Sequence, residues 1–273
     1  MNKFYVIANS GKDIDGALSK EIANYIKNSG HICVLEEDGP VTEDVECILV
    51  LGGDGTLLRA ARELKYHEIP LLGINLGTLG YLADIDKNSI YPALDRLFAD
   101  EYTLESRMML RGTVYHEGKE VYSDIALNDV VINREGPLRV VKFRNYVNGA
   151  FLNEYKADGI IVSTATGSTG YSLSVGGPIV SPETSILMMT PIAAHTLNTR
   201  SVIFPGEDKI MVEIGPGRMG QRDAATANFD GAATRSMETG DYIVIEKAEQ
   251  KRRLVKINNI SFLETLRTKM RNS

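Results

Sequence analysis

The sequence predicts a two-domain protein in which an α/β domain, with a parallel sheet and flanking helices, precedes a β-rich domain. Three observations lead to this prediction. Apolar runs alternate with helix-periodic stretches through the first hundred residues, and such alternation is typical of a parallel sheet covered by helices. After about Tyr102 the pattern changes to short strands joined by tight turns. With 273 residues, of which 43% are hydrophobic, the chain is long enough to form two cores.

The α/β pattern begins with a strand over Phe4–Ala8. Apolar residues then recur every four positions from Ile14 to Ile26, which predicts a helix that Gly30 ends. The remaining elements follow as strands at His31–Leu35, Cys47–Leu51 and Pro70–Ile74 and helices at Leu57–Leu64 and Ile90–Phe98. Ligands of such sheets bind beyond the carboxyl ends of the strands, so the loops after the third and fourth strands are expected to line one cleft.

The β-rich domain is indicated by turn dipeptides that separate alternating apolar segments. Glu117–Gly118 and Asn148–Gly149 are such dipeptides, and Asn-Gly is a strong hairpin signal. Further strands are expected at Ser201–Phe204, Lys209–Ile214 and Tyr242–Lys247. A final helix over residues 260–273 is predicted by a capping box, Ser261 to Glu264, and by one apolar stripe that comprises Phe262, Leu263, Leu266 and Met270. The predicted domains are residues 1–104 and 105–259.

The segment Gly52–Thr56, called the GGDGT loop below, joins an apolar strand to a helix. Its glycines let backbone N–H groups approach a ligand, and the N-terminus of the following helix favours negative charge, so the loop predicts a phosphate-binding site. It has neither the Lys-Ser or Lys-Thr pair of a Walker loop nor the G-x-G-x-x-G spacing of a dinucleotide site. Asp54 lies at its centre, and the sequence leaves two roles open for this carboxylate: a base or metal contact in phosphoryl transfer, or a helix cap.

A second loop, Thr166–Ile179, is rich in glycine and hydroxyl residues and follows a β-branched strand. It holds far more potential ligand donors than a connection needs, which indicates a binding loop. Between the two loops, the segment Leu127–Asn133 sets an amide and an acid, Asn128 and Asp129, into an apolar strand.

The composition argues against several classes of partner and site. A net charge of −6 disfavours non-specific nucleic-acid binding, which requires a basic surface, although local donors can still hold an anionic nucleotide. Cys33 and Cys47 lie in apolar runs without metal-ligand spacing and are interpreted as buried free thiols, so no metal ligands are predicted. Neither a signal peptide nor a membrane-spanning run is evident, and a cytoplasmic location with no membrane partner is the expectation.

Taken together, Gly52–Thr56, Asn128–Asp129 and Thr166–Ile179 resemble the three signatures of NAD kinases, in the same order and at the same separations. Gly73–Leu82 and Thr190–Arg200 extend the resemblance to nearly the whole chain. The first loop alone is shared with diacylglycerol and sphingosine kinases and, more loosely, with phosphofructokinases, whereas the long second loop is specific.

This resemblance implies an enzyme that transfers the γ-phosphoryl group of ATP to the 2′-hydroxyl of the adenosine ribose of NAD. Magnesium or another divalent cation would accompany ATP, and inorganic polyphosphate is left open as the donor. The family forms homodimers and homotetramers through its β domains, and its terminal helix, here residues 260–273, returns to the first domain.

The resemblance also implies roles for individual residues. Asp54 would accept the hydroxyl proton or hold the hydroxyl in line, and the backbones of Gly53 and Gly55 would approach the phosphates. The adenine and ribose of NAD would contact Asn128 and Asp129. The other positions implied near the bound dinucleotide are Tyr81, Asp158, Thr166, Thr169, Gly170, Tyr171, Ser174, Ala193 and His195. Asp230–Gly231 also matches a short family motif near the NAD phosphates.

Several of these assignments have a simpler structural alternative. Asn128 and Asp129 could form an Asx turn, Tyr81 could be a core aromatic, and His195 could be structural. Asp-Gly at 230–231 is equally a common turn. The candidate cations for ATP phosphates are Arg59, Arg62 and Arg200, of which the first two lie three apart on a helix beside Glu63 and could simply pair at its surface.

Two other functions are weighed against an NAD kinase. A lipid or sugar kinase could share the GGDGT loop, but Thr166–Ile179 and Asn128–Asp129 speak against it. A non-catalytic sensor would bind NAD without chemistry at Asp54. Two positions depart from the family pattern, because Asp129 stands where many members have Glu and Val175 where Ala is frequent.

Overall fold

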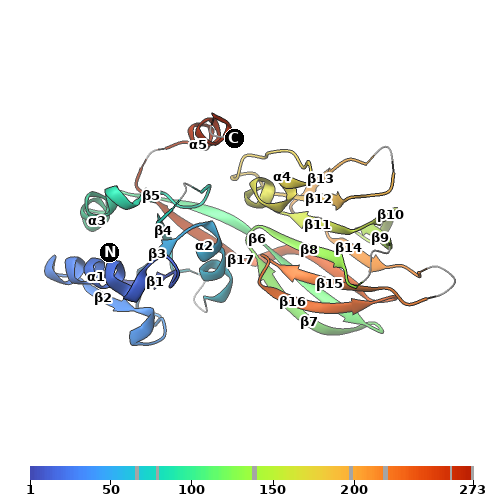
Figure 1. The fold of residues 1–273 in the computed structure, drawn as a ribbon, viewed down its shortest axis with the longest axis horizontal. Helices are drawn as coiled ribbons and strands as arrows, with labels where there is room; N and C mark the ends of the chain where they lie inside the picture. The colour runs from blue at the N-terminus through green and yellow to red at the C-terminus, as the bar shows by residue number, and fades with distance from the viewer. Residues whose placement is uncertain are drawn as a thin grey trace. The chain divides into compact units, whose positions relative to one another are not determined.

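The computed structural model of the chain divides into two compact units, residues 1–107 with 251–273 and residues 108–250. The structure describes residues 1–64, 68–77, 80–136, 140–196, 199–217, 221–258 and 260–271. The first unit contains a parallel sheet with helices, and strands dominate the second (Figure 1). The predicted fold class is therefore confirmed.

The first unit is built on parallel strands. Its strands are β1 (Lys3–Ala8), β2 (Ile32–Leu35), β3 (Cys47–Gly52), β4 (Leu71–Asn75) and β5 (Ile85–Asp86), and its helices are α1 (Ala17–Asn28), α2 (Asp54–Glu63), α3 (Ile90–Phe98) and α5 (Phe262–Arg271). The sheet order is β2, β1, β3, β4, with β5 also paired to β4, and each of these pairs is parallel. The carboxyl ends of β1, β3 and β4 therefore meet at one edge of the sheet, which positions the loops that follow them.

The core of this unit lies between the strands and the helices that pack on them. Phe4, Leu49 and Leu72 from the strands and Ile22 and Ile26 from α1 are all buried in one cluster. The two cysteines are buried free thiols, as predicted, and burial raises the pKa of Cys33 to about 11 and that of Cys47 to about 12.

The predicted start of the first helix is wrong. Helix α1 begins at Ala17, and Ile14 lies before it with 72% of its surface exposed. The carboxylate of Asp13 accepts hydrogen bonds from Leu18 N (2.8 Å) and Ser19 N (3.1 Å). Because this side chain satisfies free N–H groups at the helix start, the regular α-helix begins later than the apolar period suggests.

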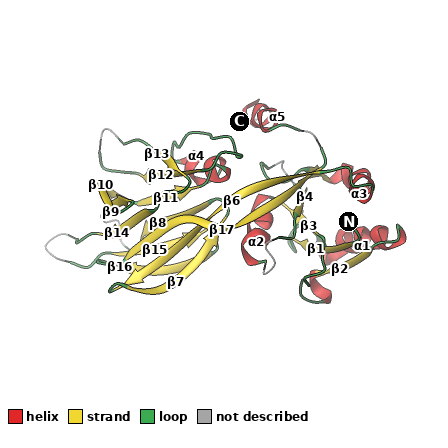
Figure 2. Cartoon of the chain, turned by 180° about the vertical axis from the view of Figure 1, so that it is seen from behind, coloured by secondary structure: helices red, strands yellow, loops and turns green. Residues whose placement is uncertain are grey.

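The strands of the second unit belong to two sheets and pair mainly antiparallel (Figure 2), and the first of these sheets also includes the parallel strands β1 to β5. In the first sheet, β9 (Val141–Val147) pairs with β10 (Ala150–Ala157) and β14 (Ile210–Ile214), β14 pairs with β17 (Tyr242–Lys256), and β6 (Thr103–His116) pairs with β7 (Lys119–Ala126). The predicted turns at Glu117–Gly118 and Asn148–Gly149 join β6 to β7 and β9 to β10. All four turn residues have positive φ, as the tight hairpin turns require.

The other sheet carries the strands beside the second predicted binding loop. Its order is β13 (Val202–Pro205), β12 (Ile186–Ile192), β11 (Gly159–Ser163), β8 (Asp129–Arg134), β15 (Ala224–Phe229) and β16 (Ala233–Glu238). Every pair in it is antiparallel. Two short helical segments, at Thr166–Thr169 and α4 (Tyr171–Ser174), follow β11.

Helix α5 groups with the first unit, as the family resemblance implies. The ring of Phe262 lies 6.4 Å from the ring of Tyr81, and Lys269 Nζ lies 5.5 Å from the centre of the same tyrosine ring. The predicted apolar stripe is only partly covered, since Leu263 and Met270 are 68% and 69% exposed. Within the described ranges, no helix combines the length and apolar character needed to span a membrane.

Candidate functional site

The GGDGT loop lies where the sheet edge meets the start of α2. Strand β3 ends at Gly52, and Gly53 has an extended backbone and caps α2 without a side chain. Helix α2 begins at Asp54, three residues earlier than predicted. The first N–H groups of a helix have no acceptor within the helix, so this end of α2 can accept an anion.

The side chain of Asp54 binds a different loop and does not cap its own helix. Its two carboxylate oxygens accept hydrogen bonds from Tyr81 N (2.8 Å) and Leu82 N (3.2 Å). These bonds fix the direction of the carboxylate and leave an acceptor position on each oxygen. Of the two roles that the sequence left open, capping of α2 is therefore wrong.

Gly80 makes room for this carboxylate. A Cβ built on Gly80 would lie 1.9 Å from Asp54 Oδ1. No feature of the sequence indicated that Gly80 faces the aspartate. The contact joins residues far apart in the chain, and only the folded backbone brings them together.

Two asparagines fasten the neighbouring loops. Asn9 donates from Nδ2 to Thr56 Oγ1 (3.2 Å), and its Oδ1 accepts from Gly11 N (3.0 Å). Asn75 bonds both ways to Gly77, with Oδ1 accepting from the backbone N–H and Nδ2 donating to the carbonyl. Asn9 directly follows an apolar strand, and Asn75 ends one. A polar residue at the end of an apolar strand is the sequence signal that could have predicted their role.

The predicted cations of α2 are engaged in ion pairs. Arg59 Nη1 lies 3.2 Å from a carboxylate oxygen of Glu36 and 3.8 Å from one of Glu63, and Arg62 lies 2.8 Å from Glu63. Arg200 belongs to the second unit and donates to the carbonyl of Thr199.

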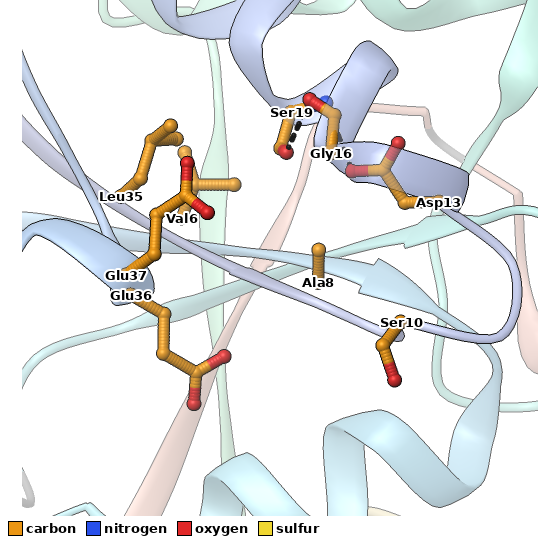
Figure 3. Close-up of a pocket in the computed structure, with 9 residues that line it drawn as sticks. All are labelled: Val6, Ala8, Ser10, Asp13, Gly16, Ser19, Leu35, Glu36 and Glu37. Atoms are coloured by element: carbon orange, nitrogen blue, oxygen red, sulfur yellow. Dashed lines mark hydrogen bonds between the residues drawn. The ribbon is translucent and has the colours of Figure 1, made fainter.

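A hollow of about 290 Å³ opens at the carboxyl ends of β1 and β2 (Figure 3). Its lining comprises Val6, Ala8, Ser10, Asp13, Gly16, Ser19, Leu35, Glu36 and Glu37. A second hollow, lined by Gly55, Thr56 and Arg59, shares Ala8, Ser10 and Glu36 with the first. The two hollows therefore adjoin and lead from the GGDGT loop to the end of β2. The volume of the first hollow is close to the lower limit for small-molecule pockets, which span roughly 300–1,000 Å³.

In the second unit, Asn128 and Asp129 stand at the start of β8. Asp129 is buried, and its burial, with a smaller contribution from the nearby Asp230 carboxylate, raises its pKa to about 7. The side-chain oxygen of Asn128 is buried and accepts no hydrogen bond from the described part of the chain. An unsatisfied buried acceptor costs free energy, so this oxygen is suited to a ligand donor.

One carboxylate holds the backbone of this pair. Asp230 accepts hydrogen bonds from Leu127 N (2.7 Å), Asn128 N (2.8 Å) and Asp129 N (3.2 Å). Asp230 has positive φ and follows β15, so it is a turn residue as well. The structure confirms the turn, and the match to a family motif near the NAD phosphates stays a prediction.

The second binding loop packs against the same pair. Thr164 donates from Oγ1 to the carbonyl of Leu127 (2.7 Å), and Gly167 approaches Asn128 so closely that a Cβ on it would lie 2.1 Å from the Asn128 carbonyl oxygen. A Cβ built on Gly170 would lie 3.2 Å from Asn128 Nδ2. The loop that carries Thr166, Thr169, Gly170, Tyr171 and Ser174 thus begins beside Asn128.

The remaining predicted residues gather at the opposite end of β11. Asp158 precedes this strand and pairs with Arg134 Nε at 2.7 Å, and Asp158 N donates to the carbonyl of Ile192. Ala193 follows Ile192 with a φ of 45°, and His195 N donates to the carbonyl of Lys156. The candidate residues of this unit therefore form two groups, one at each end of β11.

The pKa of Asp129 predicts a pH-dependent stability. In the folded state the Asp129 carboxyl retains its proton to about pH 7, whereas the ordinary pKa of an aspartate is 3.8. The folded state therefore binds more protons between these values, and stability should fall as pH rises through this range, by at most about 1.4 kcal/mol per pH unit, and level off above it.

The Asp129→Asn variant should lack this contribution. Urea unfolding of both proteins between pH 5 and 8 measures it, because other titrating groups cancel in the difference between wild type and variant. We expect the wild type to lose stability relative to the variant as pH rises to about 7. A difference that stays constant over the whole range would contradict the assignment.

Comparison with known proteins identifies both parts of the chain. Residues 12–102 match the model of the ATP-NAD kinase N-terminal domain, and residues 127–257 match that of the ATP-NAD kinase C-terminal domain. An NAD kinase from Lachnospira eligens is 47% identical over 99% of this chain and 100% of its own length. An NAD kinase from Agathobacter rectalis is 44% identical over 100% of this chain and 99% of its own length.

Solved structures agree in fold. The crystal structure of an NAD kinase from Archaeoglobus fulgidus in complex with ATP superposes with a TM-score of 0.78 at 27% identity and covers 99% of both chains. Yeast NADH kinase complexed with NADH superposes with a TM-score of 0.84 at 22% identity and covers 98% of this chain and 86% of its own.

Proposed function

Because the chain belongs to the ATP-NAD kinase family, we propose that it transfers the γ-phosphoryl group of ATP to the 2′-hydroxyl of the adenosine ribose of NAD, which yields NADP and ADP. The observation that carries the proposal is the arrangement at Asp54, which begins α2 and whose carboxylate is oriented by the N–H groups of Tyr81 and Leu82. This arrangement combines a proton acceptor with a helix end that favours phosphate.

Asp54 would act on the attacking hydroxyl. As the bond from the 2′-oxygen to the γ-phosphorus forms, the bond from that phosphorus to the bridging oxygen of ADP breaks, and the hydroxyl proton passes to Asp54. A carboxylate is a weak base in water, so much of its effect would come from holding the hydroxyl in line. The Gly53 and Gly55 backbones, with the N-terminus of α2, would lie against the phosphates.

A divalent cation would enter with ATP. When bound, Mg²⁺ neutralises part of the charge on the phosphates. The carboxylate of Asp54 is of the ligand type that Mg²⁺ prefers, and it retains acceptor positions. The described residues contain no group of three His, Cys, Asp or Glu side chains arranged to hold a metal ion.

NAD would extend along β11. The buried oxygen of Asn128 would accept from the adenine amino group, and Asp129, which holds its proton to about pH 7, would donate to or accept from the adenosine ribose. The nicotinamide carboxamide would lie by Asp158, near Ala193 and His195. The loop residues Thr166, Thr169, Gly170, Tyr171 and Ser174 would line the pocket. One group of candidate residues lies at each end of β11, and this spacing suits NAD, which has a nucleoside at each of its two ends.

A direct assay tests the proposal. The protein is incubated with NAD, ATP and magnesium, and NADP is measured through an NADP-specific dehydrogenase. We expect NADP to accumulate with time and enzyme concentration. Absence of NADP, from protein that is folded by circular dichroism and still binds NAD, would refute the kinase activity and favour a sensor.

A further inference from the structure

A lysine from the loop after β1 reaches over the GGDGT loop. A Cβ built on Gly53 would lie 3.4 Å from Lys12 Nζ, and one built on Gly77 would lie 2.9 Å from it. The ammonium therefore lies above the residue that caps α2 and beside the loop after β4. No feature of the sequence distinguished Lys12 from the other lysines of the chain.

The backbone of Lys12 is firmly held. The carbonyl of Asn9 accepts hydrogen bonds from Lys12 N and Asp13 N, both at 2.9 Å. The side chain of Asn9 bonds to Thr56 of the GGDGT loop, and the carboxylate of Asp13 bonds to the start of α1. The loop is thus fastened at both ends, so binding a ligand would restrict only the lysine side chain.

The described residues provide no counter-ion for the ammonium of Lys12. Among the residues that the structure describes, no carboxylate oxygen lies within 4.0 Å of Lys12 Nζ, and Nζ takes part in no hydrogen bond. Nearby cations differ, because Arg59 pairs with Glu36 and Lys20 pairs with Glu37 at 3.6 Å.

The ammonium of Lys12 and the start of α2 both favour an anion between them. The end of α2 carries partial positive charge from N–H groups without intrahelical acceptors, and the lysine adds a full positive charge above it. An anion between the ammonium and the helix end would be attracted by both. A polyphosphate chain, with oxygens on successive phosphorus atoms, can contact both at once.

We propose that Lys12 binds the polyphosphate chain of the phosphoryl donor and holds it against the GGDGT loop. The inference rests on the proposed function in one respect, namely that the donor is a triphosphate. Lys12 is then the cation for the donor phosphates, and Arg59 remains a surface partner of Glu36. The recognised chemistry belongs to the phosphates and is shared by ATP and inorganic tripolyphosphate.

The test compares Lys12→Met and Lys12→Arg with Lys20→Met as the control. Lys20 is a second exposed lysine of the same unit, and its ion pair with Glu37 lies outside the GGDGT loop. Dissociation constants for ATP and for tripolyphosphate, each with magnesium, are measured by calorimetry in the absence of NAD. The KM for ATP and kcat are measured separately.

We expect Lys12→Met to weaken the binding of both ligands by about 10- to 100-fold, the usual loss for one charge-assisted hydrogen bond. Lys12→Arg should recover most of the affinity because it keeps the charge, and Lys20→Met should stay within about twofold of wild type, as expected of an exposed ion pair. The KM for ATP should rise in parallel with the dissociation constant.

Three results would overturn the proposal. They are unchanged ATP binding in folded Lys12→Met, a loss for ATP without a loss for tripolyphosphate, and an equal loss in Lys20→Met. These results are separate from the kinase assay. If wild-type protein made no NADP while its ATP affinity still depended on Lys12, the proposed function would fail and the phosphate site would stand.

Discussion

Replacing Asp54 by asparagine should lower kcat for NADP formation by about 100- to 10,000-fold, the usual range for loss of a general acid or base. The substitution removes the proton acceptor and keeps the size of the side chain. An amide can accept one of the two hydrogen bonds that Asp54 receives from Tyr81 N and Leu82 N, but its NH₂ group cannot accept the other. Steady-state kinetics with the coupled NADP assay measure the effect.

The matched control is Asp86→Asn. Asp86 is an exposed aspartate of the same unit whose carboxylate also accepts a backbone N–H, that of Asn88 at 2.8 Å. The Asp86→Asn variant should retain wild-type kcat, and the dissociation constant for NAD should be unchanged in both the Asp54→Asn and the Asp86→Asn variants. An Asp54→Asn variant with kcat within about tenfold of wild type would show that proton transfer to Asp54 contributes little.

Replacing Gly80 by alanine should lower kcat by about 100-fold, because a displacement of about 1 Å in a reacting group can have this effect. The added methyl group would lie 1.9 Å from Asp54 Oδ1, so the carboxylate or the loop must move. The backbone of Gly80 does not have the positive φ that would make alanine strained for a different reason.

A double-mutant cycle separates this effect from general damage. If Gly80→Ala acts by displacing the carboxylate, it should change kcat little in a protein that already carries Asp54→Asn. Additive losses would instead show that Gly80 acts independently of Asp54. Thermal melting of all three variants checks that they remain folded.

The sequence alone predicted the large features of the fold well. The alternation of apolar runs and helix-periodic stretches gave the parallel sheet, and the Glu117–Gly118 and Asn148–Gly149 dipeptides marked two real hairpins. These features depend on local residue preference and period, which a single chain displays directly. The starts of α1 and α2 were wrong because a capping side chain at Asp13 and the tight GGDGT turn override the apolar period.

The family was also evident from the sequence, since the order and spacing of Gly52–Thr56, Asn128–Asp129 and Thr166–Ile179 are properties of the chain. Only the tertiary structure decided what each polar group contacts. Asp54 meets the N–H groups of Tyr81 and Leu82, and Asp230 holds the backbone of Asn128 from 102 positions away. Such partners are set by how distant segments pack, and neither residue period nor motif spacing specifies the distance between two atoms in space.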